Sequence, residues 1–236
     1  MLQKPQAFLI DMDGTMIDSE KYWIRAEQKV AQKYGKFLPE EFSINLVGES
    51  IASSCEKIVN YLNINISSKD FANEVVDTVK MYMENEGINW RPGAKQLLEY
   101  ANANNIPAML VTSSYEKVCK IFVEVANEQV TKGLCGYISG DMVVNPKPNP
   151  ECYIKASQQL GVDIKQCVVI EDSNAGINAG IKAGAKVIAI PFIMKLKKHA
   201  DVNYVPSMKK ITPELLDKIL SNQIIDLCEE KCESNI

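Results

Sequence analysis

The chain has few of the side chains on which several common kinds of active site depend. Its 236 residues include one histidine, His199, and only two arginines, Arg25 and Arg91, among 26 basic residues. Zinc sites built on several histidines are therefore excluded, and any Ser-His-Asp triad would have to include His199. His199 lies beside several lysines and is expected at the surface. A bound phosphate would have to be held mainly by lysine, backbone amides, hydroxyl groups or a metal ion.

Long apolar runs and signals for secretion are also missing. No apolar run approaches the ~18–20 residues that a membrane helix requires, and the run at residues 7–10 ends at Asp11, too early for a signal peptide. The seven cysteines are scattered and contain no Cys-x-x-Cys, so free thiols in a reducing cytoplasm are expected. The formal net charge of -4 gives no electrostatic reason to expect nucleic acid or an anionic membrane as a partner. We therefore expect a cytoplasmic globular protein, and a monomer is the favoured state.

Short apolar runs alternate with stretches of helical periodicity. The runs expected to form buried strands are residues 7–10, 108–111, 167–170 and 187–190, with residues 204–205 as one more short strand. Helical stripes lie between them, and residues 213–220 are expected to form a closing helix. This alternation predicts an α/β fold with a Rossmann-like parallel sheet and helices on both faces.

One long segment breaks the alternation. Residues 19–89 contain no strand pattern, but apolar residues recur at helical spacing, for example at Trp23, Ala26 and Val30. We interpret residues 18–89 as an inserted α-helical cap domain, with hinges near residues 17–20 and 87–93. Residues 1–17 and 90–236 then form the core domain, and the charged tail at 228–236 is expected to fray.

Two of the expected strands are followed directly by carboxylates. Asp11 and Asp13 follow the first strand, in the sequence Asp11-Met12-Asp13-Gly14-Thr15, and Glu171-Asp172 follows the third. Open parallel sheets place ligand sites outside the carboxyl ends of their strands, and buried carboxylates are costly unless they are used. One carboxylate of the first pair could bind a cation and attack, while the other handles a proton. The alternative for this pair is a solvated Asp-Gly turn that closes the strand.

Two further segments carry groups that can hold a phosphate. Thr112, Ser113 and Ser114 follow the second strand and offer hydroxyls and backbone amides. Alternatively, Ser114 caps the helix that follows. Lys147 lies between two prolines that stiffen its backbone, which favours a fixed point charge over an ordinary solvated lysine.

The sequence has no nucleotide-binding signature. It contains neither a P-loop nor a Gly-x-Gly-x-x-Gly after a strand, so nucleotide binding is discounted. Gly176, Gly180 and Gly184 repeat at four-residue intervals, which predicts instead that a helix packs closely on the sheet.

Taken in order, these motifs resemble those of the haloacid dehalogenase superfamily of phosphohydrolases. The matching residues are Asp11-Met12-Asp13-Gly14-Thr15, Thr112, Lys147 and Glu171-Asp172. The position and helical content of the insertion are similar to the subfamily with an α-helical cap, which includes β-phosphoglucomutase, phosphoglycolate phosphatase and sugar-phosphate phosphatases. The resemblance implies a magnesium-dependent phosphatase that hydrolyses a small phosphorylated metabolite, such as a sugar phosphate, through an aspartyl-phosphate.

The resemblance also implies a role for each core residue. Asp11 would attack phosphorus, and Asp13 would protonate the leaving group and then activate water. Mg²⁺ would bind the side chains of Asp11 and Asp172 and the backbone carbonyl of Asp13, and Glu171 is either one more ligand or a support for the ligands. The residues implied to hold the phosphate oxygens are Thr112, Ser113 and Lys147.

Three other functions share parts of this pattern. A phosphomutase has the same core residues, but the cap arginine that holds a second phosphate in β-phosphoglucomutase is matched here by Ile51, so hydrolysis is favoured. A dehalogenase does not need Asp13 with Mg²⁺, and a non-enzymatic phosphoacceptor or scaffold would not need the intact catalytic set. The cap residues that could face the substrate are Trp23, Gly48, Glu49 and Lys80, although the interpretation favoured for Trp23 is the packed core of the cap helices.

Overall fold

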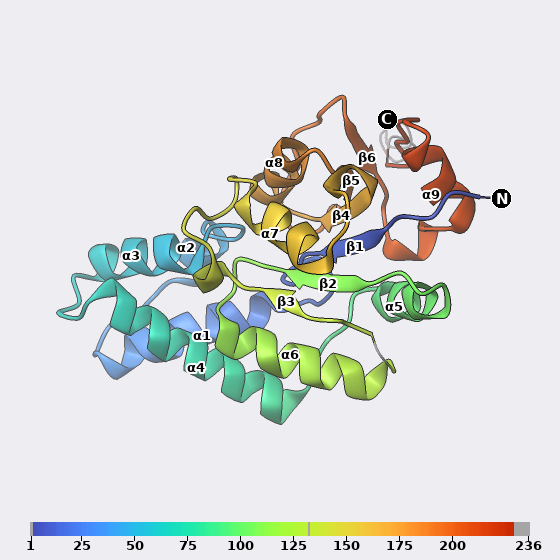
Figure 1. Cartoon of the computed structure of the whole chain (residues 1–236). Coiled ribbons are helices and arrows are strands. Elements are labelled where there is room, and N and C mark those ends of the chain that lie inside the picture. Colours follow the sequence, from blue (N-terminus) through green and yellow to red (C-terminus); the bar gives the residue numbers. More distant parts are fainter. Residues whose placement is uncertain (1, 132, 229–236) are drawn as a thin grey trace, which may run out of the picture.

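A parallel sheet of six strands lies at the centre of the structure (Figure 1), a computed structural model that describes residues 2–131 and 133–228. The strands lie in the order β3-β2-β1-β4-β5-β6, and every pairing between them is parallel. Their bounds are β1 Ala7–Ile10, β2 Ala108–Val111, β3 Tyr137–Ile138, β4 Cys167–Glu171, β5 Lys186–Ala189 and β6 Val202–Tyr204. The predicted α/β fold with a Rossmann-like sheet is therefore confirmed.

The strand predictions succeed for the four apolar runs and are less accurate at the edges of the sheet. β3 has only two residues, too few for a run or an alternation to mark it in the sequence. β5 begins at Lys186, one residue before the predicted run, and β6 lies at residues 202–204 rather than 204–205. β6 contains the buried Asn203, whose side chain donates to the Val187 carbonyl at 3.0 Å, so no continuous apolar run indicates this strand.

Helices cover both faces of the sheet because the central strands are buried on both sides. Phe8 and Ile10 of β1 lie on the face covered by α5, α6 and α9, whereas Ala7 and Leu9 lie on the face covered by α7 and α8. The bounds of these helices are α5 Ala94–Ala103, α6 Glu116–Gln129, α7 Glu151–Leu160, α8 Asn174–Ala183 and α9 Pro213–Leu220. Short 3₁₀ helices lie at Gly140–Met142, Ile164–Gln166 and Met208–Lys210.

Close packing of a glycine-containing helix on the sheet, as predicted, is found at α8. A Cβ atom on Gly180 would lie 2.9 Å from Val187 Cγ2. Gly184 has a different role, because it ends the helix in the left-handed conformation with a φ of 86°.

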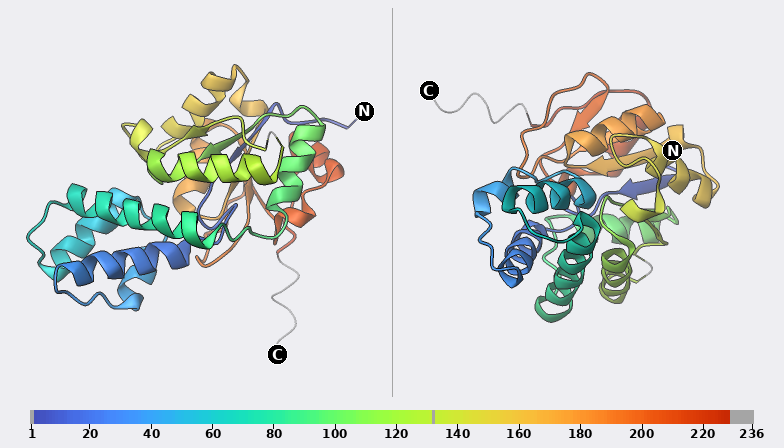
Figure 2. Two further views of the ribbon diagram at one scale, coloured as in Figure 1. Left: turned by 90° about the horizontal axis from the view of Figure 1, so that it is seen from below. Right: turned by 90° about the vertical axis from the view of Figure 1, so that its left-hand side faces the viewer.

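The residues between β1 and α5 form four helices: α1 Glu20–Lys33, α2 Glu40–Ile44, α3 Ile51–Leu62 and α4 Ser68–Glu86. Figure 2 shows them grouped on one side of the sheet, where α4 packs against both α1 and α3. Only helices, and no strand of the sheet, are described between residues 19 and 89, as the periodicity predicts. The boundaries of a separate cap domain at residues 18 and 89 stay a prediction.

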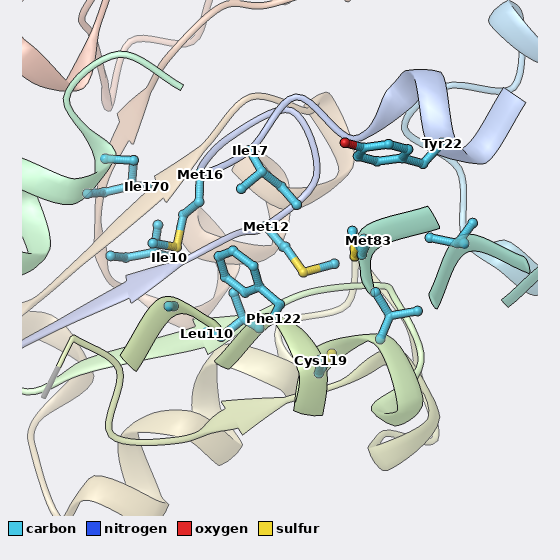
Figure 3. Close-up of a cluster of buried hydrophobic side chains, with 14 of the residues drawn as sticks. Ile10, Met12, Met16, Ile17, Tyr22, Met83, Leu110, Cys119, Phe122 and Ile170 are labelled. Carbon is cyan, nitrogen blue, oxygen red and sulfur yellow. The ribbon is translucent and has the colours of Figure 1, made fainter. Parts of the chain in front are cut away.

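The two chain segments that lead into and out of this helical insertion run side by side. The Asp18 amide donates to the Asn89 carbonyl at 2.8 Å, and the Arg91 amide donates to the Met16 carbonyl at 2.9 Å. Beneath them a single cluster of buried side chains includes Met12 and Ile17 after β1, Tyr22 of α1, Met83 of α4 and Phe122 of α6 (Figure 3). The insertion is therefore seated on the carboxyl-end side of β1 through apolar contacts, which places α1 above the loop that follows β1.

Other expectations from the sequence concern the surface and the thiols. Within the described parts of the chain, no helix has the length and apolar composition needed to cross a membrane. Cys55, Cys119, Cys135, Cys152 and Cys167 are free thiols, as expected, and His199 is exposed. The predicted fraying of the tail concerns residues that, after Cys228, lie outside the described ones.

Candidate active site

Loops after β1, β2 and β4 meet at the carboxyl edge of the sheet and carry most of the predicted site residues. The Asp11 amide donates to the Ile170 carbonyl at 3.0 Å, which holds the first loop against the end of β4. Gly14 has a φ of 77°, and a Cβ atom there would lie 2.1 Å from Asp172 Oδ2. Glycine at this position therefore permits both the turn and the close approach of the two acidic loops.

Lys147 joins the two acidic motifs. Its ammonium group lies 2.7 Å from Asp11 Oδ1 and 2.7 Å from Glu171 Oε1, and it also donates to the Val111 carbonyl at 2.9 Å. The side chain is 4% exposed. Burial alone would lower the pKa of Lys147, but the carboxylates of Asp11 and Glu171 raise it well above its usual value. Lys147 is therefore a fixed, buried cation at the end of β1.

Glu171 is held by hydrogen bonds on both of its oxygens. Oε1 accepts from Lys147 and from the Tyr153 hydroxyl, and Oε2 accepts from the backbone amides of Asp172 and Ser173 and from the Ser173 hydroxyl. Gly176 provides the space for this carboxylate, because a Cβ atom there would lie 1.6 Å from Oε1. Both carboxylate oxygens of Glu171 therefore already accept hydrogen bonds from the protein.

Asp11, Glu171 and Asp172 form a buried acidic cluster, with one oxygen of each within 4.8 Å of the others. Burial and the Glu171 charge raise the pKa of Asp172 to about 8, and the same two causes raise the pKa of Asp11. Asp11 Oδ2 and Asp172 Oδ2 accept no hydrogen bond from the described residues, whereas Glu171 has no such open oxygen. These two aspartates therefore have the free, hard oxygen atoms that would suit a divalent cation.

Asp13 lies beside this cluster and accepts hydrogen bonds from three parts of the chain. The Trp23 indole N–H donates to Oδ1 at 2.8 Å, and the Ser19 hydroxyl donates to the same atom at 2.5 Å. The Ser114 hydroxyl donates to Oδ2 at 2.5 Å, with Thr112 Oγ1 at 3.4 Å. Asp13 is therefore not the carboxylate of a solvated turn, because the insertion and the loop after β2 both hold it.

The expectation that Ser114 caps the following helix is wrong. The N-cap of α6 is Tyr115, with no side-chain hydrogen bond to the helix, and the Ser114 hydroxyl turns instead to Asp13. The helix begins one residue later than a cap at Ser114 requires, and the Ser114 hydroxyl donates its proton to a charged carboxylate, which makes a strong hydrogen bond. The Ser114 amide donates to Thr112 Oγ1 at 3.0 Å, which orients the threonine.

A cavity of about 100 Å³ lies between these loops and the helical insertion. Its core-side wall includes Asp11, Asp13, Thr112, Ser113, Lys147 and Asp172. Trp23, Gly48 and Glu49 line it from the insertion, and Trp23 also packs against the hydrophobic cluster. Glu49 Oε1 lies 2.5 Å from the Lys57 ammonium group. Burial acts to raise the pKa of Glu49, but the contact with Lys57 outweighs it, and the pKa of Glu49 is lowered.

Lys80, the fourth candidate from the insertion, does not join the other three at the cavity. It is not among the residues that line the cavity, and its ammonium lies 3.6 Å from Glu84, one turn further along α4. The α4 residue that lines the cavity is Val75. Five residues correspond to ~1.4 turns of helix, so Lys80 and Val75 lie on different faces of α4.

Sequence reasoning also missed several residues that line the cavity. Glu20 and Glu27 of α1 lie on the same helix face as Trp23 and Ile24, at spacings of three, four and seven residues. Ser43 of α2 lines the same side of the cavity. Burial and the charge of Asp13 raise the pKa of Glu20 to about 8, and burial raises the pKa of Glu27 to about 7. Acidic residues within an otherwise apolar helix stripe were the signal that could have identified them.

Comparison with known proteins adds independent information. Residues 8–190 match the sequence profile of the family described as Haloacid dehalogenase-like hydrolase. Hexitol phosphatase A of Escherichia coli (strain K12) is 32% identical over 186 residues, which cover 78% of this chain and 82% of that protein. Probable pseudouridine-5'-phosphatase of Drosophila melanogaster is 29% identical over 196 residues, 81% of this chain and 84% of that protein. The structure of β-phosphoglucomutase from Clostridium difficile matches with a TM-score of 0.76 and 24% identity over 92% of this chain and 98% of that one, a likeness of fold.

Proposed function

This chain belongs to the haloacid dehalogenase-like hydrolase family, and we propose that it is a magnesium-dependent phosphatase for a small phosphorylated metabolite. It is a hydrolase of phosphoric monoesters, as are the phosphatases to which it is similar. The observation that carries the proposal is the Asp11 carboxylate, fixed by Lys147 at 2.7 Å beside Asp172 in the wall of the cavity. The reaction would proceed through an aspartyl-phosphate at Asp11.

Asp11 is the proposed nucleophile. Its Oδ1 is anchored by Lys147, and its Oδ2 has no protein donor among the described residues, so this oxygen is available to attack phosphorus. The new bond from Oδ2 to phosphorus forms as the ester bond to the leaving oxygen breaks. Thr112, the Ser113 amide and Lys147 line the same wall and would hold the equatorial oxygens, where negative charge must be stabilised.

Asp13 is the proposed acid and base. Its place in the cavity wall, two residues after Asp11, would let it give a proton to the leaving alkoxide. It would then take a proton from the water that cleaves the aspartyl-phosphate, which returns both aspartates to their starting states. The donors Ser19, Trp23 and Ser114 support this role by fixing the orientation of the carboxyl group.

Mg²⁺ fits the residues at this site. Buried carboxylates outnumber the single buried lysine, and Asp11 and Asp172 each keep one oxygen without a protein donor. Asp172 Oδ2, the Asp13 backbone carbonyl and Asp11 Oδ1, which keeps a lone pair besides the one that accepts from Lys147, would hold the ion and leave Asp11 Oδ2 for the attack. The ion, when bound, supplies positive charge next to the phosphate. Glu171 is better suited to another task, because its oxygens already hold Lys147 and the loop after β4.

The composition of the cavity supports a hydrolase over a phosphomutase. Lys147 is the sole basic residue of the cavity wall within the described chain, and Ile51 stands where the resemblance aligns the mutase arginine. A second phosphate would therefore meet no basic side chain in the described cavity wall on the insertion side, where Glu49 is already paired with Lys57. We expect β-glucose 1-phosphate, supplied with a trace of the 1,6-bisphosphate, to yield free phosphate faster than glucose 6-phosphate. The opposite order would assign a mutase.

The proposed function is tested by release of phosphate from a chromogenic aryl phosphate and a panel of phosphorylated metabolites, with and without Mg²⁺. Asp11→Asn nearly preserves shape and removes the attacking charge, so it should abolish turnover. Asp201→Asn, at an exposed carboxylate 3.7 Å from His199, is the matched control and should keep it. Turnover by Asp11→Asn comparable to that of the control would refute the mechanism.

A further inference from the structure

The end of the cavity that lies within the helical insertion carries polar groups that the proposed phosphate chemistry does not use. Glu27 of α1 and Ser43 of α2 both line it and are buried, at 7% and 3% exposure. Ser43 Oγ has no hydrogen-bond partner among the described residues. It lies near enough to Glu27 to oppose the rise in the pKa of that carboxyl, but not in a geometry that completes a hydrogen bond. A buried hydroxyl left in this state costs free energy unless a ligand or water satisfies it.

The charges on this side of the cavity restrict what can bind there. The insertion contributes no basic residue to the described cavity wall: Glu20 and Glu27 have raised pKa values, and Glu49 is already paired with Lys57. The one lysine of the cavity wall is already held between Asp11 and Glu171. A leaving group with a carboxylate or a second phosphate would therefore lose its hydration without gaining a positive partner.

The pairing of a carboxyl with a serine hydroxyl favours a neutral hydroxyl over a cation. A ligand hydroxyl can donate to Glu27 and at the same time accept the proton of the unpartnered Ser43 Oγ–H. An ammonium group has donors only and would leave Ser43 without an acceptor. Apolar side chains complete this end of the cavity and suit the carbon skeleton of a polyol: Ile24, Leu46, Ile51 and Val75.

The position of Glu27 on its helix sets the distance from the reacting bond. Trp23, one turn earlier on α1, donates to Asp13, the proposed acid for the leaving oxygen. Four residues of helix rise by ~6 Å, so Glu27 would meet a hydroxyl several carbons away from the phosphoester oxygen, as in a sugar alcohol of about four to six carbons.

We propose that Glu27 and Ser43 form a hydroxyl-binding subsite that selects a neutral polyol as the leaving group and disfavours anionic ones. This inference rests on the proposed phosphatase function and names its substrate class. A site built to exchange hydrogen bonds with a substrate hydroxyl discriminates strongly against analogues that lack it.

The test compares kcat/KM for four probes: sorbitol 6-phosphate, phosphoglycolate, phosphoethanolamine and 4-nitrophenyl phosphate. The wild-type protein should turn over sorbitol 6-phosphate at least about tenfold better than phosphoglycolate or phosphoethanolamine. Ser43→Ala and Glu27→Leu, which remove the hydroxyl and the carboxyl acceptor, should each lower kcat/KM for sorbitol 6-phosphate about fivefold to tenfold more than for 4-nitrophenyl phosphate, the effect of one hydrogen bond. Ser157→Ala, a buried serine of α7 that bonds the Ile154 carbonyl, is the matched control and should leave the ratio unchanged.

The outcomes separate this inference from the function on which it rests. If the protein hydrolyses none of the probes, the aryl phosphate included, the proposed phosphatase function is refuted. Hydrolysis of the aryl phosphate, with phosphoglycolate used as well as or better than sorbitol 6-phosphate, would overturn the subsite alone. A preference for phosphoethanolamine would show that the subsite binds a cation and not a polyol, and would also overturn it. Ser43→Ala removes an unpartnered hydroxyl, so it should not lower the melting temperature; an unchanged probe ratio in this folded variant would also overturn the subsite.

Discussion

The Trp23 indole N–H donates a 2.8 Å hydrogen bond to Oδ1 of Asp13, and this bond joins α1 to the loop after β1. The position of the helical insertion is thereby linked to the orientation of the proposed acid and base. Ser19, at the start of α1, donates to the same oxygen, so two residues of the insertion act on one carboxyl group. A shift of α1 would change both contacts at once.

We expect Trp23→Phe to lower kcat for aryl phosphate hydrolysis about tenfold, because phenylalanine keeps the aromatic packing but cannot donate to Asp13. Steady-state kinetics measures the effect. Trp90→Phe is the matched control, since the Trp90 indole donates to Gln129 on the surface. Equal kcat values for the two variants would show that the indole bond does not orient Asp13 for catalysis.

Lys147→Ala should lower kcat/KM by roughly two to three orders of magnitude, equivalent to ~3–4 kcal/mol of lost transition-state stabilisation. The structure adds a second reason, since the lysine also holds Asp11 at 2.7 Å. Lys120→Ala removes a surface lysine paired with Glu116 and serves as control. Kinetics within about threefold of wild type for Lys147→Ala would contradict a role for this ammonium group at the phosphate.

Gly176→Ala should destabilise the protein by about 3 kcal/mol and also impair turnover, because the added methyl group collides with a carboxylate that cannot move without releasing Lys147. Its Cβ atom would lie 1.6 Å from Glu171 Oε1. Gly180→Ala is a graded comparison on the same helix, where the nearest atom is a valine methyl at 2.9 Å. Chemical denaturation measures the free energy of unfolding of the two variants, and steady-state kinetics measures their turnover. If Gly176→Ala is less stable but fully active, the position of Glu171 does not matter for catalysis.

The stability of the wild-type protein should fall as Glu27 loses its proton. Burial raises the pKa of Glu27 from an ordinary 4.5 to about 7, so between these values the folded state binds the proton more tightly than the unfolded chain does. Glu27→Gln does not titrate, and its free energy of unfolding relative to wild type should rise between pH 5 and pH 8 by up to about 3 kcal/mol. Denaturant unfolding at both pH values measures this change, with Glu128→Gln, at an exposed site, as a control. A difference that does not vary with pH would show that Glu27 ionises freely in the folded protein.

Features encoded by neighbouring residues were predictable from the sequence. β1 and β4 are apolar runs ended by carboxylates, and their parallel pairing brings Asp11 and Asp172 to one edge of the sheet. The N-cap expected at Ser114 was wrong because α6 begins one residue later, and the contact of Ser114 with Asp13, distant in the sequence, is not visible in the local pattern. The meeting of Glu27 with Ser43 depends on how α2 folds over α1, and no local pattern reports it.

β1 is synthesised well before β2 and β4, the two strands that pair with it. Phe8 pairs with Ala108 of β2 and with Val168 of β4, so the first strand leaves the ribosome long before either partner exists. Helices α1 to α4, whose contacts with one another are closer in sequence, can form in the meantime, since long chain loops are slow to close. Asp11 and Asp172 meet only after β4 has been made. A nascent chain that stops earlier lacks Asp172, and we expect it to be inactive, however well its helical insertion has folded.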